Sequence, residues 1–321
     1  MSVPPQSSPP SPPISVPPSL PMGAPLGRSP TVKVDVPICA VFLFLFTCGA
    51  VGHMTLFRLN LRRGLKFIPS AVTFGFCIAR ISACAMRIAW ACHPFNTGVA
   101  IAAQIFVAAG VLLLFILNTI YAHRLLRAFH PQVGWSRGLS IIFKILYIVV
   151  VLTLVMVIVT VVQIFNTTNP NTRRIDRDIQ LYGQSYFLFF ATMPLWIIAY
   201  TLLAPRRPGQ KIDHFGKGSY TARFLIVGVT QLLLLAGAAW RAGSNYASPQ
   251  PATQPPWYTH KAAFYVMNFG VEITCVFIYL FGRIDQRFYV PDGSSKVRRY
   301  HSNNEAVKEP NDDQTLAGRK A

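Results

Sequence analysis

The chain has 321 residues, of which 52% are hydrophobic and only 13% charged, and its formal net charge is +19. This composition is too apolar for a soluble chain of this length and is typical of a membrane protein. A large positive charge also suits a nucleic-acid-binding protein, but such a protein carries its basic residues on one face of a soluble domain. Here the Lys and Arg residues lie in short segments between apolar stretches, so nucleic acid is excluded as a partner.

Apolar stretches of membrane-spanning length follow one another along most of the chain. A helix rises 1.5 Å per residue, so roughly 20 residues cross a hydrocarbon core about 30 Å thick. The predicted fold class is therefore all-α, a polytopic membrane protein built as a bundle of seven transmembrane helices. The seven predicted spans are Val36–Phe57, Ile68–Cys92, Gly98–Tyr121, Leu139–Phe165, Ser185–Leu203, Phe224–Arg241 and Lys261–Phe281.

The spans divide the chain into three predicted parts. Residues 1–34 form a Pro/Ser-rich tail, since 11 of the 25 prolines lie within the first 30 residues, and this tail is predicted to be disordered. Residues 35–290 form the transmembrane domain, and residues 291–321 form a disordered cytosolic tail. A second proline-rich segment, residues 248–256, is predicted to be a flexible loop between the last two spans.

The distribution of basic residues predicts the orientation in the membrane. The segments after the first, third, fifth and seventh spans contain 20 Lys and Arg residues, whereas the segments on the opposite side contain 5. Because cytoplasmic loops carry the excess of positive charge, the N-terminus is predicted outside and the C-terminus in the cytosol. The pattern predicts a multi-pass membrane protein and fits the plasma membrane and an endomembrane equally.

Two features fall near the predicted outer surface. The chain contains one Asn-x-Ser/Thr sequence, at Asn166, which makes this residue a candidate glycosylation site. Cys39 and Cys92 lie near the same surface, where they form either one disulfide or two free thiols.

The motifs of integral-membrane enzymes are missing from the sequence. No two histidines are four residues apart, which is the spacing that a helical zinc site requires. No serine in a span has the glycine flanks and histidine partner that a nucleophile needs. We therefore expect neither an enzyme nor a bound metal or cofactor.

Polar residues inside the spans are the candidate functional residues. An ionisable group at mid-bilayer costs roughly 2.5–3.5 kcal/mol on insertion scales, so it is retained with a partner or for a task. Arg80 and Arg87 lie seven residues apart and share one face of the second span, while Gln231 stands alone in the sixth. The candidate intramembrane polar site comprises Arg80, Arg87, Gln104, Asn118, Asn268 and Glu272.

Two interpretations of this set remain open. The side chains can face the bundle interior and hold the helices together through hydrogen bonds, which is the favoured interpretation for Gln104, Asn118 and Gln231. The charged residues can instead line a cavity for an anionic or amphipathic small molecule. Arg80 and Arg87 carry two positive charges and Glu272 one negative charge, so one positive charge is not neutralised. An acidic ligand would neutralise it, or a water-filled pocket would solvate it.

The depths of the charged residues predict one specific ion pair. Arg80 lies roughly 18 Å from the outer end of its span and Glu272 roughly 16 Å from the outer end of the seventh. Glu272 is the only carboxylate inside a predicted span, so Arg80 and Glu272 are predicted to be partners. Arg87 lies only about 7 Å from the outer end and is expected to reach the interface.

Several short segments carry a resemblance to a known family, and they include Asp35–Leu43, Gly52–Met54, Phe74–Cys77, Arg87–Trp90, Ala102–Gly110, Arg124–Arg127 and Asp176–Asp178. They resemble a family of seven-span proteins of filamentous fungi, a domain of unknown function whose members are often labelled "family-C-like G-protein-coupled receptor". The similarity extends over residues 35–290 and implies a receptor-like seven-span layout without an established chemistry. A second fungal seven-span group, the lipid-translocating exporters, shares this layout.

Three functions are compatible with these observations. The first is a receptor-like sensor that binds a small ligand and acts on a cytosolic signalling partner, with membrane lipids around it. The second is a transporter or translocator of lipids or amphipathic molecules, and the third is a structural membrane protein without a ligand. Its basic cytosolic loops suit anionic lipid headgroups and a signalling partner equally.

The predicted orientation can be tested with reporters. A reporter fused after Ala321 is expected in the cytosol, and Asn166 is expected on the opposite side, because the positive-inside rule governs insertion. Fluorescence and glycosylation-shift assays measure both positions. A lumenal C-terminus would mean that the orientation is reversed or that one span is miscounted.

Overall fold

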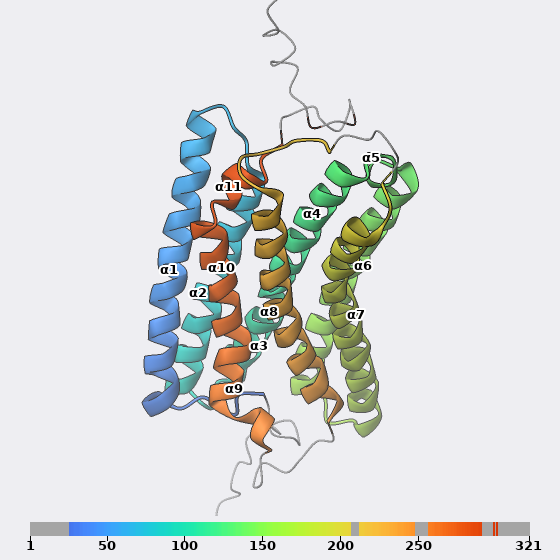
Figure 1. Ribbon diagram of the computed structural model, residues 1–321. Helices are drawn as coiled ribbons and strands as arrows, with labels where there is room; N and C mark the ends of the chain where they lie inside the picture. The colour runs from blue at the N-terminus through green and yellow to red at the C-terminus, as the bar shows by residue number, and fades with distance from the viewer. Residues whose placement is uncertain (1–25, 207–211, 248–255, 291–297, 299, 301–321) are drawn as a thin grey trace, which may run out of the picture.

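The computed structural model describes residues 26–206, 212–247, 256–290, 298 and 300, and these residues form helices without strands. Seven of the helices are long and apolar enough to cross a membrane, which confirms the predicted fold class. They stand side by side as one bundle (Figure 1). Most of both predicted tails and of the proline-rich loop lies outside the described residues, but α1 already begins at Val32, inside the segment assigned to the tail.

The seven spans correspond to ten of the described helical elements. The single-helix spans are α1 (Val32–Arg62), α2 (Ile68–Cys92), α6 (Arg137–Asn166), α7 (Pro170–Leu203) and α8 (Tyr220–Tyr246). The third span consists of α3 (Thr97–Gly110) and α4 (Leu112–Phe129), and the seventh of α9 (Lys261–Tyr265), the π-helical turn η2 (Val266–Gly270) and α10 (Val271–Phe281). Short helices outside the spans are α5 (Pro131–Gly134), η1 (Trp257–Thr259) and α11 (Ile284–Arg287).

Side-chain caps fix where several spans begin. The side chains of Ser136, Asn169 and Ser219 each accept a hydrogen bond from a backbone N–H in the first turn of α6, α7 and α8. Such caps satisfy one of the four N–H groups that a helix start leaves without a partner. At α7 the cap is followed by Pro170, which suits the first helical position because no N–H is needed there.

The start of α7 differs from the prediction. The fifth span was expected to begin at Ser185, whereas α7 begins at Pro170 and leaves only residues 167–169 between it and α6. The early turns of α7 carry Arg173, Arg174 and Arg177, which the sequence had placed in a loop. Their polarity hid the helix from a criterion based on apolar length.

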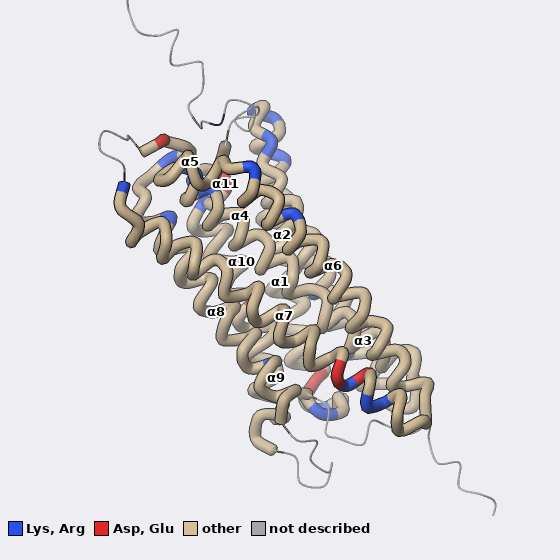
Figure 2. Tube along the Cα trace, turned by 90° about the vertical axis from the view of Figure 1, so that its right-hand side faces the viewer, with Lys and Arg blue, Asp and Glu red and all other residues tan. Residues whose placement is uncertain are grey.

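The bundle presents apolar side chains outward and charges at its ends. Along α6, Ile141, Ile145, Ile148 and Leu152 are exposed at successive turns, as expected for a surface that lipid covers. Figure 2 shows Lys and Arg concentrated near α5 and α11 at one end, and basic and acidic residues together at the other. Following the predicted orientation, we call the end where α1 begins the outer end and the end near α5 and α11 the inner end (Figure 1).

Two spans are interrupted near the middle of the bundle. The third span breaks between Gly110 and Leu112, and the seventh contains the π-helical turn over Val266–Gly270. The fifth span contains Pro194, but α7 continues through it. Irregular backbone at membrane depth is tolerated only where other protein groups or water in a cavity bond to the freed N–H and C=O groups. Both interruptions therefore indicate a functional site in this region.

A close approach of α8 to the seventh span fixes the position of one of these interruptions. A Cβ atom on Gly237 would lie 2.8 Å from the carbonyl oxygen of Met267, which belongs to η2. Only glycine permits this contact between the backbones. The contact holds the next turn of α8, which carries Arg241, beside η2.

Substitution of two glycines in α8 should therefore have opposite effects. Gly237→Ala is expected to lower the free energy of unfolding by about 1–3 kcal/mol, because the methyl group would push α8 away from η2. Gly228→Ala is the matched control, since its Cβ would meet no atom within 4 Å, and it should stabilise by about 0.5–1 kcal/mol. Thermal unfolding in detergent measures both. Equal shifts would contradict the close approach.

Candidate functional site: a buried charge network and a basic cavity

The predicted ion pair between Arg80 and Glu272 is confirmed. Arg80 Nη2 lies 2.5 Å from Glu272 Oε1, and both side chains are almost completely buried. Arg80 Nη1 donates two further hydrogen bonds, to the carbonyl oxygens of Phe106 and Val107 at 3.1 and 2.9 Å. The guanidinium group is thus held by a carboxylate on α10 and by backbone acceptors on α3.

The interruption of the third span provides those backbone acceptors. The last carbonyl groups of a helix lack their full set of intrahelical partners, and α3 ends at Gly110, within one turn of Phe106 and Val107. Gly110 also leaves space for the arginine, because a Cβ atom there would lie 2.7 Å from the Arg80 guanidinium carbon. The helix end and the buried cation therefore satisfy each other.

Glu272 has a second cationic partner, Arg241 of α8, which the sequence analysis did not single out. Arg241 Nη1 lies 3.6 Å from Glu272 Oε1 and donates a hydrogen bond of 2.9 Å to Asn268 Oδ1. Two guanidinium groups thus share one carboxylate, and Asn268 connects Arg241 to the π-helical turn. Arg241 was overlooked because it stands at the predicted end of the sixth span, although α8 continues to Tyr246.

Arg87 does not reach the interface as expected but is buried and paired. Its Nη2 lies 3.0 Å from Asp35 Oδ1, and its Nε donates a hydrogen bond to Tyr265 Oη at 2.9 Å. The expectation that Glu272 is the only carboxylate inside a span was therefore wrong. The predicted first span began at Val36, one residue beyond Asp35, whereas α1 begins at Val32 and includes it.

Asp35 joins the first and the last spans at the outer end. Its carboxylate accepts a hydrogen bond from Tyr265 Oη at 2.8 Å and forms an ion pair with Lys261. Tyr265 Oη also lies 3.1 Å from Cys39 Sγ, and both Cys39 and Cys92 are free thiols, so the disulfide alternative is wrong. This outer cluster is separate from the Arg80–Glu272 pair.

Asn118 belongs to a third polar cluster, nearer the inner end. Its side chain donates a hydrogen bond to Gln231 Oε1 at 3.0 Å and accepts one from Tyr279 Oη at 2.7 Å. Gln231, which seemed isolated in the sequence, also donates to the carbonyl oxygen of Ala191 on α7. The cluster connects α4, α7, α8 and α10, as the interpretation of these amides as interhelical contacts predicts.

A cavity of about 640 Å³ lies at the outer end, above the Arg80–Glu272 pair. The lining from α3 and α6 is apolar apart from Gln104, whereas the lining from α7 and α8 is mostly polar. No Asp or Glu is among the described residues that line it. Five arginines line it: Arg87, Arg173, Arg174, Arg177 and Arg241.

The cavity separates the six predicted site residues into groups. Arg87, Gln104 and Asn268 line it, whereas Arg80 and Glu272 lie directly behind Arg241 and Asn118 lies in the inner cluster. Gln104 makes no hydrogen bond within the described residues and takes part in the cavity wall. Asn166 is exposed at the last residue of α6, where its side chain donates to the Val162 carbonyl oxygen at 3.0 Å.

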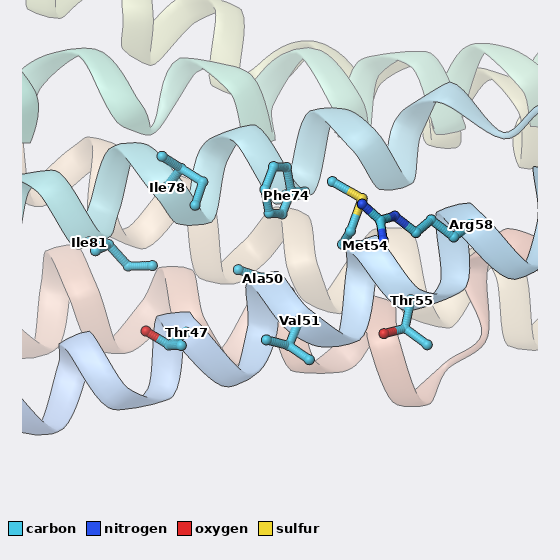
Figure 3. A pocket seen from close by; sticks show the side chains of 9 residues that line it. All are labelled: Thr47, Ala50, Val51, Met54, Thr55, Arg58, Phe74, Ile78 and Ile81. Atoms are coloured by element: carbon cyan, nitrogen blue, oxygen red, sulfur yellow. The ribbon is translucent and has the colours of Figure 1, made fainter.

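A second, shallower hollow lies between α1 and α2 on the outside of the bundle. Figure 3 shows apolar side chains from both helices along it, with Arg58 at one end. Arg58 is its only charged lining residue within the described chain, and several other lining residues, including Val51 and Ile78, are exposed. We expect lipid chains to cover this surface, since it is apolar and lies on the outside of the bundle. Neither Arg80 nor Glu272 lines it.

The shared carboxylate predicts an order of sensitivity to mutation. Glu272→Gln should be the most destabilising change, by about 3–5 kcal/mol, because it leaves two buried guanidinium groups without a carboxylate. Arg80→Met should cost less because Arg241 still pairs with Glu272, and Arg241→Met should cost least because its contact is longer.

Thermal unfolding of the purified variants measures this order, and a double-mutant cycle between positions 80 and 272 measures the coupling. Arg62→Met is the control, since Arg62 is exposed and should change stability by less than about 0.5 kcal/mol. Additive effects of the two core mutations would show that the contact contributes no coupling energy.

Comparison with known proteins gives one finding, and it concerns the helices that carry part of this network. Residues 217–289 match a family model described as "Protein of unknown function (DUF3112)". No curated protein and no solved structure matches the chain. The matched segment runs from α8 to α11 and is therefore similar to that family in the part of the bundle that contains Arg241, Asn268 and Glu272.

Proposed function

We propose that this integral membrane protein is a receptor-like sensor that binds a small ligand in the cavity at its outer end. The observation that carries the proposal is that the cavity ends inside the bundle. Arg241 and Asn268 line it on the side of the Arg80–Glu272 pair, which lies immediately behind them. A site of this kind admits a ligand from one end and holds it there.

The layers behind the cavity support binding over passage. Beyond Arg80 and Glu272 lies the cluster of Asn118, Gln231 and Tyr279, whose side chains are fully buried and bonded to one another. A solute that crossed the bundle would have to break both polar layers. The proposed ligand instead stays within the cavity, in front of both layers.

The contacts of Arg241 suggest how binding would affect the inner end. Arg241 lines the cavity and bonds to Asn268 of the π-helical turn, and α10 continues from this turn to the inner end. There α11 is tied to α1 by the bond from Asn60 to Asp285 Oδ2 at 3.0 Å. A ligand with different affinities for two arrangements of this turn would shift their populations, and a cytosolic partner at the inner end would respond.

A transporter of amphipathic molecules is the second candidate, because two interrupted spans meet in this region. The break after Gly110 and the turn Val266–Gly270 both flank the Arg80–Glu272 pair, and discontinuous helices at such sites are common in transporters. In that case the Arg80–Glu272 pair and the cluster around Asn118 would separate alternately, so that the cavity faced first one side of the membrane and then the other.

Cysteine accessibility distinguishes the two candidates. In a background where the exposed Cys48 and Cys92 are replaced by Ser, Ser244→Cys tests the cavity wall and Thr230→Cys the buried layer behind it. A membrane-impermeant thiol reagent is expected to label Ser244→Cys from the outer side only and Thr230→Cys from neither side. Lys217→Cys, exposed at the inner end, is the control for labelling from the cytosol.

Labelling of Thr230→Cys from either side would contradict the closed cavity and favour transport. The reagent is applied separately to right-side-out and inverted vesicles, and the labelled fraction is measured by mass shift. Labelling of Ser244→Cys from the inner side alone would overturn the proposed direction of ligand entry.

A further inference from the structure

We infer that the ligand of this cavity is an amphipathic organic anion, bound with its acidic head at the arginines of α7 and its apolar tail against the wall formed by α3 and α6. The inference rests on the proposal that a small ligand occupies the cavity. It adds the chemical class of that ligand and its direction in the site, which follow from how charged and apolar side chains are distributed between the walls.

Two arginines of α7 lie near the outer mouth. Counted from the start of α7, Arg174 and Arg177 lie roughly 6 and 11 Å deep. They are three residues apart on one face of the helix, and both line the cavity. An anionic head at this depth can therefore contact both guanidinium groups, whose planar, two-pronged geometry suits a carboxylate.

The charge of this mouth is not neutralised from within the cavity. Arg87 has Asp35 as a partner and Arg241 has Glu272, but Arg174 and Arg177 form no ion pair among the residues that the structure describes. The two carboxylates nearby in α7, Asp176 and Asp178, are not lining residues. Arg177 donates only a long bond of 3.5 Å to the carbonyl oxygen of Ala247.

The start of α7 adds to the preference for an anion. Pro170, the first residue of this 34-residue helix, lines the cavity. The N-terminus of a helix carries a partial positive charge from its aligned peptide dipoles, which favours a negative group nearby. The start of α7 and the arginines therefore both favour a negatively charged ligand.

The wall formed by α3 and α6 is apolar apart from Gln104. Val107 and Ala108 of α3 and Val157 and Val161 of α6 line it. Ala108 lies roughly 17 Å from the start of α3 and Val157 roughly 14 Å from the outer end of α6, so this wall extends deeper than the arginines of α7. A ligand that only carried charge would leave this wall against water, whereas an apolar tail would remove it from water.

The same arrangement argues against other ligand classes. A cation would face five arginines without a carboxylate to receive it, and a small inorganic anion would use the mouth but not the wall. An uncharged apolar molecule would use the wall but would separate the arginines from water without giving them an acceptor. The amphipathic anion uses both parts of the cavity.

Binding of radiolabelled dodecanoate to the protein in zwitterionic nanodiscs tests the inference. Saturable binding above the level of empty nanodiscs is expected, and dodecanol, dodecylamine and acetate should compete at least tenfold less well. Hexanoate should bind more weakly than dodecanoate, since each methylene added should tighten binding up to about fourfold until the wall is covered.

Variants at each part of the cavity locate the two ends of the ligand. Arg174→Gln and Arg177→Gln should each weaken dodecanoate binding roughly tenfold, because each removes a charge-assisted hydrogen bond. Lys33→Gln is the matched control, since Lys33 is an exposed cation at the same end outside the cavity lining. Ala108→Phe should remove the advantage of dodecanoate over hexanoate while leaving hexanoate binding within about threefold of the original.

The outcomes separate this inference from the proposed function. If dodecanol competes as well as dodecanoate, or if Lys33→Gln weakens binding as much as Arg177→Gln, the inferred class or place is overturned. If acetate binds as tightly as dodecanoate, the apolar part is overturned. Absence of any dodecanoate binding, while Ser244→Cys is still labelled from the outer side only, overturns the ligand class and leaves the one-sided cavity standing.

Discussion

The structure depends on the scarcity of carboxylates in the bundle interior. Arg80, Arg87 and Arg241 lie in membrane-spanning helices, and within the described part of the chain only two carboxylates, Glu272 and Asp35, pair with them. A guanidinium group in hydrocarbon is costly unless it is paired, so the available acceptors decide where the helices can lie. Each of the two carboxylates accordingly contacts cations from two helices, and these contacts tie the first, second, sixth and seventh spans into one arrangement.

Irregular backbone provides further hydrogen-bond acceptors for the buried arginines, in addition to the two carboxylates. The end of α3 offers carbonyl oxygens to Arg80, and the π-helical turn places Asn268 beside Arg241. In a regular helix those carbonyl groups would be used internally, and Asn268 would project in another direction. The two interruptions and the buried cations are therefore one feature, in which each compensates the other.

Much of the bundle could be predicted from the sequence, because apolar length is a direct consequence of bilayer thickness. The Arg80–Glu272 pair was also predictable, since both residues lie deep in clearly bounded spans. The Asp35–Arg87 pair was not, because a boundary placed one residue past Asp35 excluded it.

The basic mouth of the cavity could not be predicted either. The early turns of α7 contain Arg173, Arg174 and Arg177, so a criterion based on hydrophobicity assigns them to a loop. These residues are helical because Asn169 caps the helix and Pro170 follows at its first position. A search for long apolar stretches does not detect this local signal. Arg241 was overlooked for a similar reason, because the predicted sixth span ended at this residue whereas α8 continues to Tyr246.

The Arg80–Glu272 contact also has a consequence for biogenesis. Its two residues are 192 positions apart in the chain, so the second span is synthesised well before the seventh, to which Glu272 belongs. During insertion the second span enters the bilayer with a deep cation that has no carboxylate yet, and it gains one only when the seventh span arrives. A chain that ends early therefore retains an unneutralised charge in the membrane, which marks it as incomplete to any quality-control system that recognises polar transmembrane segments.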